Sequence, residues 1–268
     1  MLRVIFTLLL CVSLPACLSP SQKFQHSAES YGFYPKQIWG ENFLHRLFLN
    51  KAVLNTPQKK ILHVYLDGDG TPWKSNRWVS ADPTSRNPIV LELINLDSSP
   101  SILLGRPCYH GLKNKFCEPK YWTSDRYSER VVNSLTTVLN KFLLENPYEK
   151  VVLIGYSGGG TLAALMARNI ININTLVTIA ANFDIEKWTH FHDYLPLTNS
   201  LNPINFPPLP ASIKQIHFAG LKDENIPAEI IKNFSDKQVN AVFYPITDFN
   251  HHCCWVSHWQ KLLTQVIY

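Results

Sequence analysis

The five residues G-Y-S-G-G at 155–159 fit the pattern G-x-S-x-G, which can present a serine hydroxyl for nucleophilic attack. An apolar run at 150–155 leads into this pattern, and a helix-forming run at 161–167 follows it. A buried strand, a tight turn and a helix in succession would hold the Ser157 oxygen above the strand end, with the Gly158 N–H turned toward a developing oxyanion. The alternative is a glycine-rich phosphate loop at a helix start, although a Walker-type lysine is missing. The pattern therefore predicts Ser157 as a nucleophile.

A serine hydroxyl is a poor nucleophile unless a histidine takes its proton and a carboxylate orients that histidine. Asp223 lies on the loop after an apolar run at 213–220, and we expect it to be this acid. Glu224 is the neighbouring rival. Asp223 could also cap the helix that Pro227 begins, and the two roles are compatible.

The last apolar run, at 241–246, leads into a loop that carries two histidines, His251 and His252. The chain order serine, acid, histidine is that of the G-x-S-x-G enzymes, which places the base on this loop. We prefer His251 as the base, with His252 as the alternative and Asp248 as a candidate further partner. A competing interpretation makes this loop a zinc or copper site. Adjacent side chains diverge, however, so we predict neither a metal nor an organic cofactor. The ligands in that interpretation would be His251, His252, Cys253, Cys254 and His258.

These segments resemble the α/β-hydrolase superfamily, on the pattern at 155–159, Asp223 with its following Pro227, and His251 near the C-terminus. The resemblance covers 61–268 and implies an α/β fold: a mostly parallel twisted sheet with helices on both faces. It implies acyl-transfer chemistry but no substrate, because esterases, lipases, thioesterases, amidases and some acyltransferases share these parts. Three further segments resemble a group of bacterial lipoprotein-type members: 105–108, 122–127 and 251–255.

The resemblance also implies that the loop after an early strand at 61–66 supplies a second oxyanion donor. The residues D-G-D-G at 67–70 stand where many relatives carry H-G-G-G, so the expected donor is the backbone N–H of Asp69. A carboxylate aimed at the site would oppose the developing negative charge, so Asp67 and Asp69 should point away or be paired. The other explanation is a plain Asp-Gly turn. We expect ion pairing for two arginines and core positions for two strand histidines: Arg106, Arg126, His63 and His217.

Apolar runs around these segments alternate as strands and helices, which indicates a parallel sheet flanked by helices. The best helix candidate spans 125–146. Aromatic-rich runs at 31–39 and 42–50 predict an opening antiparallel hairpin. The irregular stretch 182–210 is either a small cap over the site or a long connector. The other expected strands are 61–66, 101–104, 150–155, 175–180, 213–219 and 241–246, and the other helices are 161–167, 227–234 and 255–266.

Residues 1–16 have the positive start, the apolar core and the small-residue ending of an export signal. The ending Leu-Pro-Ala-Cys resembles a bacterial lipobox, which implies that Cys17 is acylated and becomes the mature N-terminus. The alternative is an ordinary signal peptide cut elsewhere. By the same resemblance, Leu18 in place of Asp favours the outer membrane. We expect 17–30 to be a tether and 31–268 to form one domain.

An exported chain reaches an oxidising compartment, where disulfides form. Cys108 and Cys117 bracket a short polar loop, so we expect a bridge between them. A link between the neighbours Cys253 and Cys254 would be a strained ring, and the sequence leaves that pair open.

The composition is that of a globular domain, 46% hydrophobic and 17% charged, and the net charge of +5 comes without the basic runs that would indicate a nucleic-acid partner. We predict an exported, membrane-anchored serine hydrolase that transfers the acyl group of an ester or thioester to water. Its partner would be a small-molecule or lipid acyl substrate. The alternatives are an acyltransferase with the same triad and a non-catalytic surface binding lipoprotein on a hydrolase scaffold. The sequence gives no indication of oligomeric state.

Overall fold

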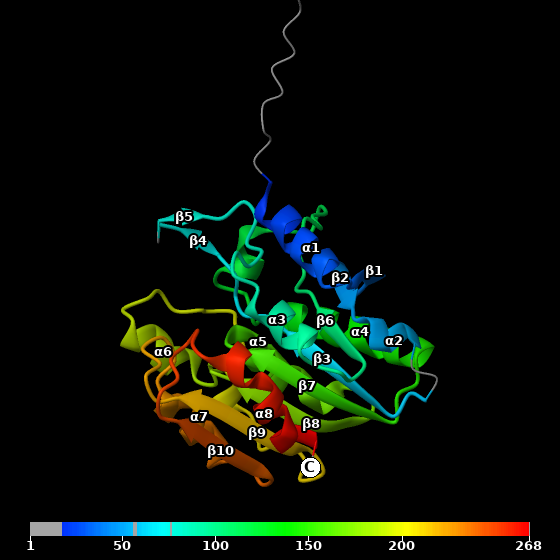
Figure 1. The fold of residues 1–268 in the computed structure, drawn as a ribbon. Coiled ribbons are helices and arrows are strands. Elements are labelled where there is room, and N and C mark those ends of the chain that lie inside the picture. Colours follow the sequence, from blue (N-terminus) through cyan, green and yellow to red (C-terminus); the bar gives the residue numbers. More distant parts are fainter. Residues whose placement is uncertain (1–17, 56–57, 76, 268) are drawn as a thin grey trace, which may run out of the picture.

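The computed structural model describes residues 18–55, 58–75 and 77–267, and an eight-stranded sheet runs through its centre (Figure 1). The strand order is β1-β2-β6-β3-β7-β8-β9-β10. Strand β2 is antiparallel to β1 and β6, and the other neighbours are parallel, so the predicted parallel sheet and opening hairpin are confirmed. The strands are β1 (Tyr34–Trp39), β2 (Leu44–Leu49), β3 (Ile61–Leu66), β6 (Ser101–Leu104), β7 (Lys150–Tyr156), β8 (Ile173–Ile179), β9 (Lys214–Gly220) and β10 (Ala241–Ile246).

Helices cover both faces of this sheet, because its central strands are apolar on both sides. In β7, Val151 and Leu153 point into one hydrophobic cluster, whereas Val152 and Ile154 point into another. Helices α4, α5 and α7 contribute to the first cluster, and α1, α3 and α8 to the second. The helices are α1 (Pro20–Ser30), α2 (Lys51–Asn55), α3 (Ile89–Asn95), α4 (Glu129–Glu145), α5 (Gly158–Met166), α6 (Ile185–Phe191), α7 (Ala228–Ser235) and α8 (Trp255–Ile267).

Strands β3, β7, β9 and β10 run in the same direction, so the loops that follow them meet at one edge of the sheet. Asp67 follows β3, Ser157 follows β7 and Asp223 lies on the loop after β9. His251 lies on the loop after β10. The topology therefore brings together side chains that are up to 184 positions apart in the chain, from Asp67 to His251.

Helix α1 corrects the tether that we expected at 17–30. The Ser19 side chain accepts a hydrogen bond from the Gln22 N–H, and the Gln22 side chain accepts one from the Ser19 N–H, which caps the helix start. Phe24 and Ala28 are buried against the body. With only these two apolar anchors in a polar segment, the helix has a weak hydrophobic signal in the sequence, and packing on the body stabilises it.

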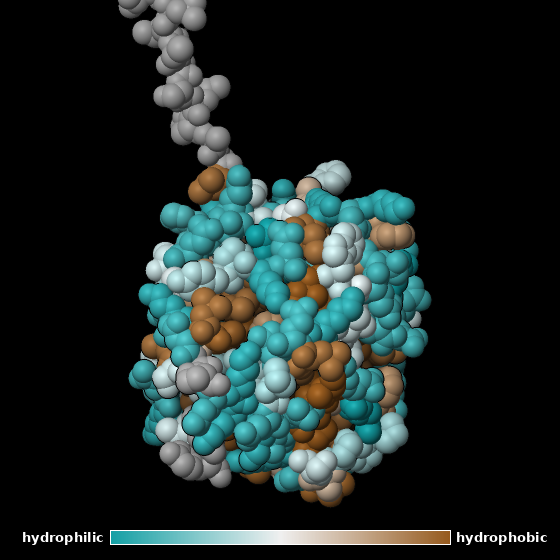
Figure 2. Space-filling model, turned by 90° about the vertical axis from the view of Figure 1, so that its right-hand side faces the viewer, coloured by the Kyte–Doolittle hydropathy of each residue, from teal (hydrophilic) through white to brown (hydrophobic). Residues whose placement is uncertain are grey.

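The structure also contains smaller elements that the sequence did not predict, among them α2. Helix α3 covers the sheet beside α8, and a short hairpin, β4 (Trp73–Lys74) with β5 (Trp78–Val79), projects from the body in Figure 1. The stretch 182–210 contains α6 and a single 3₁₀ turn (Pro203–Asn205), joined by irregular chain. Most of the face shown in Figure 2 is hydrophilic, with separated apolar patches. Along the described ranges, the helices are too short or too polar to cross a bilayer.

Between residues 18 and 267, two disulfides join neighbouring parts of the chain. Cys108 is bonded to Cys117, the pair that we expected, with 5.6 Å between the Cα atoms. Cys253 is bonded to Cys254, the pair that the sequence left open. The export signal at 1–16 and the acylation site predicted at Cys17 lie outside the described residues.

Candidate active site

Ser157 occupies a sharp turn between β7 and α5. Its φ of 51° and ψ of −125° are a strained conformation for a residue with a side chain, and such strain is commonly kept at functional sites. The turn fits only because Gly155 has no side chain, since a Cβ there would collide with the backbone of Gly159 and Gly160. Ser157 is half-buried and lines a large cavity.

The structure brings Ser157, His251 and Asp223 together in a single hydrogen-bonded line. The His251 Nε2 lies 3.1 Å from the Ser157 Oγ, and the His251 Nδ1 lies 2.8 Å from the Asp223 Oδ2. Asp223 and His251 are both buried. With Nδ1 donating to the carboxylate, Nε2 of the neutral ring is free to accept the serine proton. This is the geometry of a nucleophile with its base and its orienting acid.

Asp223 has two structural tasks, one for each carboxylate oxygen. Its Oδ1 accepts hydrogen bonds from the N–H groups of Asn225 and Ile226, at 2.9 and 2.8 Å, and this fixes the turn that leads into α7. Its Oδ2 remains for His251. The rival Glu224 is exposed on the same loop. Asp223 thus partners His251, but it does not cap α7, because the N-cap of that helix is Pro227 and receives no side-chain cap hydrogen bond.

The two histidines of the last loop have different surroundings. The His251 carbonyl accepts hydrogen bonds from the Tyr156 hydroxyl at 2.9 Å and from the Trp255 indole at 3.0 Å, which anchors the residue. His252 is largely exposed, and its Nδ1 lies 3.2 Å from the Tyr156 hydroxyl. The part of its ring that is shielded from water, together with the nearby His251, lowers the pKa of His252. Asp248, the candidate further partner, is exposed, and its carboxylate pairs with Lys222 instead.

Two residues that line the cavity with Ser157, Gly158 and Asp69, have backbone N–H groups that are candidates to bind an oxyanion. Gly158 is the first residue of α5, where N–H groups lack a partner within the helix. The N–H of Asp69, on the loop after β3, makes no hydrogen bond within the described residues. The Asp69 carboxylate is paired with Arg106 and Arg126, each at 2.8 Å. The Asp69 carboxylate is therefore paired, as it must be if the N–H of the same residue is to bind an oxyanion. The ion pairing expected of both arginines is confirmed.

Asp67, at the start of the same loop, carries the other carboxylate. Burial raises its pKa to about 6, against the opposing hydrogen bond from the Gly68 N–H and the attraction of Arg106. Asp67 therefore becomes neutral more readily than an ordinary aspartate, which reduces its opposition to a negative charge near Ser157.

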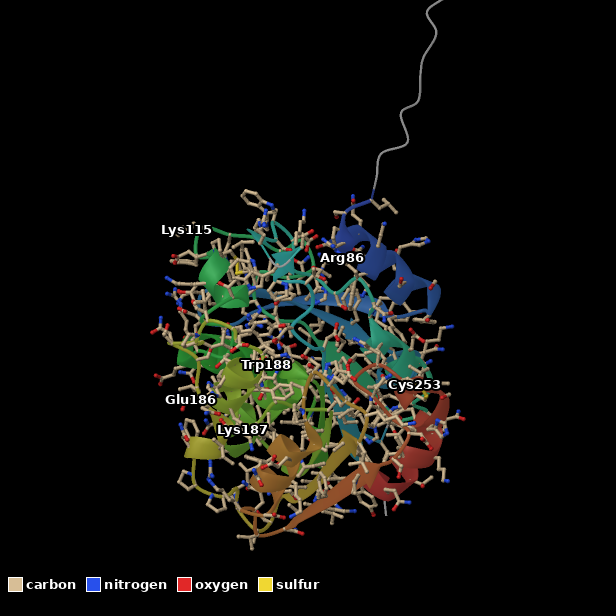
Figure 3. All side chains as sticks on the ribbon, turned by 90° about the vertical axis from the view of Figure 1, so that its left-hand side faces the viewer. Arg86, Lys115, Glu186, Lys187, Trp188 and Cys253 are labelled. Atoms are coloured by element: carbon tan, nitrogen blue, oxygen red, sulfur yellow. A yellow bond between two sulfur atoms is a disulfide. The ribbon has the colours of Figure 1, made fainter. Side chains whose placement is uncertain are left out.

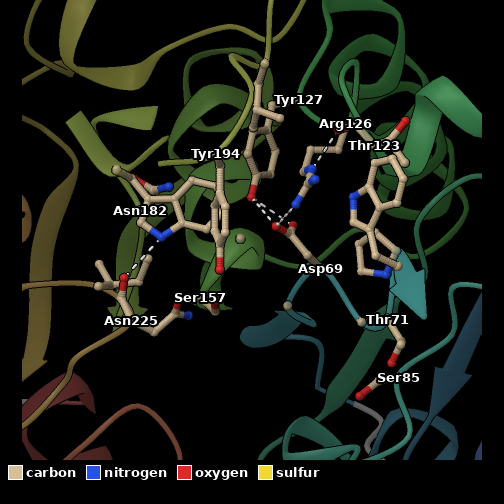
Figure 4. A pocket seen from close by; sticks show the side chains of 18 of the residues that line it. Asp69, Thr71, Ser85, Thr123, Arg126, Tyr127, Ser157, Asn182, Tyr194 and Asn225 are labelled. Carbon is tan, nitrogen blue, oxygen red and sulfur yellow. Dashed lines mark hydrogen bonds and ion pairs between the residues drawn. The ribbon is translucent and has the colours of Figure 1, made fainter. Parts of the chain in front are cut away.

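The cavity around Ser157 has a volume of about 960 Å³, large enough for a ligand of drug-like size. Its walls combine the polar loop after β3 with aromatic and aliphatic side chains of the stretch 182–210 (Figure 4). Trp188 of α6 donates its indole N–H to the Asn225 carbonyl at 3.0 Å, which links that stretch to the Asp223 loop. Figure 3 shows Trp188 and Arg86, two lining residues, on the same side of the molecule. The stretch 182–210 thus borders the site, as a cap would.

The metal interpretation of the last loop does not fit this geometry. Both ring nitrogens of His251 are engaged, and Cys253 and Cys254 are bonded to each other. Within 18–55, 58–75 and 77–267, no three potential ligand side chains converge on one point. The strand histidines His63 and His217 are buried and bonded to Asp97 and Thr178, which are the core positions we expected.

Sequence reasoning missed several residues of the site. Tyr127 donates to the Asp69 carboxylate, and the Tyr156 hydroxyl anchors His251. Tyr127 lies in the segment 122–127, whose only signal in the sequence is its resemblance to bacterial lipoprotein-type members of the superfamily. Tyr156 occupies the variable position of G-x-S-x-G, where the pattern gives no information. The wall formed by Trp188 and its neighbours had no signal beyond an irregular, aromatic-rich stretch.

Comparisons with known proteins agree with this architecture at the level of the fold. No family model matches the chain, and no curated protein is similar to it in sequence. Among solved structures, an esterase from Pyrococcus furiosus is 14% identical with a TM-score of 0.60, over 89% of this chain and 92% of the esterase. A putative hydrolase from Agrobacterium vitis is 12% identical with a TM-score of 0.62, over 88% and 99%. An acylaminoacyl peptidase from Pyrococcus horikoshii is 11% identical with a TM-score of 0.58, over 87% and 41%. The chain thus has the α/β-hydrolase fold.

Proposed function

We propose that this protein is a serine hydrolase that cleaves carboxylic esters or thioesters, with Ser157 as nucleophile, His251 as base and Asp223 as orienting acid. The observation that carries this proposal is the position of His251, with one nitrogen 3.1 Å from the Ser157 oxygen and the other 2.8 Å from the Asp223 carboxylate. The esterase among the similar structures supports ester cleavage, whereas the peptidase is the reason to test amide substrates as well.

The residues divide the reaction between them. The Ser157 Oγ attacks the carbonyl carbon while the His251 Nε2 takes the serine proton, and Asp223 stabilises the imidazolium that forms. The negative oxygen of the tetrahedral intermediate would accept hydrogen bonds from the N–H groups of Gly158 and Asp69. His251 then gives its proton to the leaving alcohol or thiol. Water attacks the acyl-enzyme by the same route and regenerates Ser157.

The cavity supports an acyl substrate with an apolar part. Its aromatic and aliphatic wall, which includes Trp188, Tyr194 and Leu197, would remove such a part from water. A series of p-nitrophenyl esters with acyl chains of increasing length, assayed alongside matched thioesters and anilides, would define the preferred length and bond.

A fluorophosphonate probe tests the nucleophile. It should label the wild-type protein and leave Ser157→Ala unlabelled, and the same substitution should abolish ester hydrolysis. The exposed Ser257, which lies outside the cavity, provides the matched serine-to-alanine control and should leave labelling intact. Equal labelling of the wild type and Ser157→Ala would remove Ser157 from the proposed role.

We also propose that the protein is exported and anchored in the bacterial outer membrane by a lipid on Cys17. The support is the sequence Leu-Pro-Ala-Cys that ends the apolar N-terminal segment, with Leu18 after it. Radiolabelled palmitate fed to expressing cells should be incorporated into the wild type and not into Cys17→Ser. The variant should then leave the membrane fraction, and an unchanged membrane association would contradict the anchor.

A further inference from the structure

The Asp69 carboxylate is enclosed by side chains that take no part in the bond-forming and proton-transfer steps proposed above. We call Asp69 and these partners the Asp69 clamp. Within it, the Oδ1 lies 2.8 Å from Arg106 Nη2, and the Oδ2 lies 2.8 Å from Arg126 Nη1. The members of the clamp are Asp69, Arg106, Arg126, Tyr109 and Tyr127.

Two tyrosines complete the clamp. The Tyr127 hydroxyl lies within hydrogen-bond distance of both carboxylate oxygens, at 2.8 and 2.7 Å, and Figure 4 shows Tyr127 and Arg126 converging on Asp69. The Tyr109 hydroxyl donates to the backbone carbonyl of Asp69 at 2.9 Å. Every acceptor of Asp69 is thus occupied, while its backbone N–H has no partner among the described residues.

The clamp also touches the residue that carries the first oxyanion donor. A Cβ atom on Gly158 would collide with the Asp69 Oδ1 and with the Tyr127 hydroxyl. The carboxylate therefore packs directly on the first turn of α5. A displacement of the Asp69 side chain would move the N–H of Asp69 and remove the support beside the N–H of Gly158.

We propose that Arg106, Arg126 and Tyr127 are positioning residues. They act through the Asp69 carboxylate to hold the N–H groups of Gly158 and Asp69 in the positions that an oxyanion formed at Ser157 would require. This inference rests on the serine hydrolase function proposed above. A buried ion network adds little to stability, because the cost of removing its charges from water offsets most of their attraction. We therefore attribute this network to its position next to the two N–H donors. The two guanidinium groups also offset the negative charges of the nearby carboxylates, since Arg106 and Arg126 attract Asp69 and Arg106 attracts Asp67 as well.

The sharpest test compares two buried tyrosines that both donate to a carboxylate. Tyr127→Phe removes the hydroxyl from the clamp, and Tyr65→Phe removes a hydroxyl that lies 2.6 Å from Asp97, outside the cavity. Loss of one oxyanion donor typically lowers kcat by about 10²–10³-fold, so weaker positioning in Tyr127→Phe should lower kcat by about 10–100-fold with little change in KM. Tyr65→Phe should keep the wild-type kcat per folded molecule.

A boronic acid inhibitor separates positioning from a merely structural role. Its tetrahedral adduct on Ser157 places a negatively charged oxygen at the oxyanion position, so its affinity should fall in parallel with kcat in Tyr127→Phe and in Arg126→Gln. Arg126→Lys, which keeps the charge, should recover part of both losses. A clamp that only stabilised the fold would lower the unfolding midpoint and leave boronate affinity unchanged.

The outcomes distinguish the two proposals. If Ser157→Ala abolishes hydrolysis but Tyr127→Phe and Arg126→Gln keep the wild-type kcat and boronate affinity, the clamp is overturned and the serine hydrolase stands. If Ser157→Ala retains hydrolysis, the function itself fails.

Discussion

Two buried histidine–aspartate pairs lie in this fold, and their surroundings differ. His251 and Asp223 are 2.8 Å apart, and His63 and Asp97 are 2.6 Å apart, in both cases from Nδ1 to Oδ2. By the side-chain contact alone, the two pairs are nearly the same. The first pair has Ser157 at its free nitrogen and a wall of the cavity beside it.

The second pair has neither. His63 lies inside strand β3, it is 1% exposed, and neither it nor Asp97 lines the cavity. The Asp97 Oδ2 also accepts from the Tyr65 hydroxyl, which in turn accepts from the Trp259 indole, so this carboxylate belongs to a network that joins β3 to α8. A hydrogen-bonded imidazole and carboxylate can therefore take part in catalysis only where a nucleophile lies within reach of the imidazole. Elsewhere, such a pair contributes to the packing of the core.

The largest expected effect comes from removing the histidine of each pair. His251→Ala should lower kcat by about 10⁵-fold, because loss of the base removes nearly all of a triad's contribution. His63→Gln should lower the free energy of unfolding and leave kcat per folded molecule close to wild type. Steady-state kinetics normalised by circular dichroism would measure both. His252→Ala is the control for its neighbour, and a large loss of kcat there would mean that the wrong histidine was assigned.

Replacing the carboxylate of each pair should also have different effects on kcat and on the free energy of unfolding. Asp223→Asn should lower kcat by about 10³–10⁴-fold through the wrong imidazole tautomer. Asp97→Asn should cost about 3 kcal/mol of unfolding free energy, the usual consequence of breaking a buried pair, with kcat preserved. Urea denaturation and ester hydrolysis on the same preparations would test this contrast. A strong loss of kcat in Asp97→Asn would show that the two networks are coupled.

A smaller effect should appear as a pH dependence of stability. Burial raises the pKa of Asp97, but the hydrogen bond and attraction of His63, together with Tyr65, outweigh it, so the pKa lies below its ordinary value. The ionised carboxylate therefore stabilises the fold above the unfolded-state pKa of about 3.9, and this stability is lost as the pH falls through the folded-state value. The stability difference between wild type and Asp97→Asn should be constant near pH 6 and shrink below about pH 4. A difference that stays constant down to pH 2 would contradict the assignment.

The sequence predicted the parts of the site that depend on local pattern. Ser157 is surrounded by its own strand, turn and helix, and Asp223 and His251 follow apolar runs in the chain order of the fold. The partners of Asp69 could not be predicted in the same way. Arg106 and Tyr127 are 37 and 58 positions away, and nothing in a local window links them to that carboxylate. Helix α3 was missed because a seven-residue apolar run has no decisive periodicity.

The position of helix α1 limits how far the folded domain could move from the proposed anchor at Cys17. Only Leu18 and Ser19 separate Cys17 from the first helical residue, Pro20, and a fully extended chain spans at most about 3.6 Å per residue. The Ser21 hydroxyl also bonds Asp82 at 2.6 Å, which holds the start of the helix on the body. With a lipid on Cys17, the globule would rest on the bilayer surface and sample only substrates within reach of the lipid headgroups.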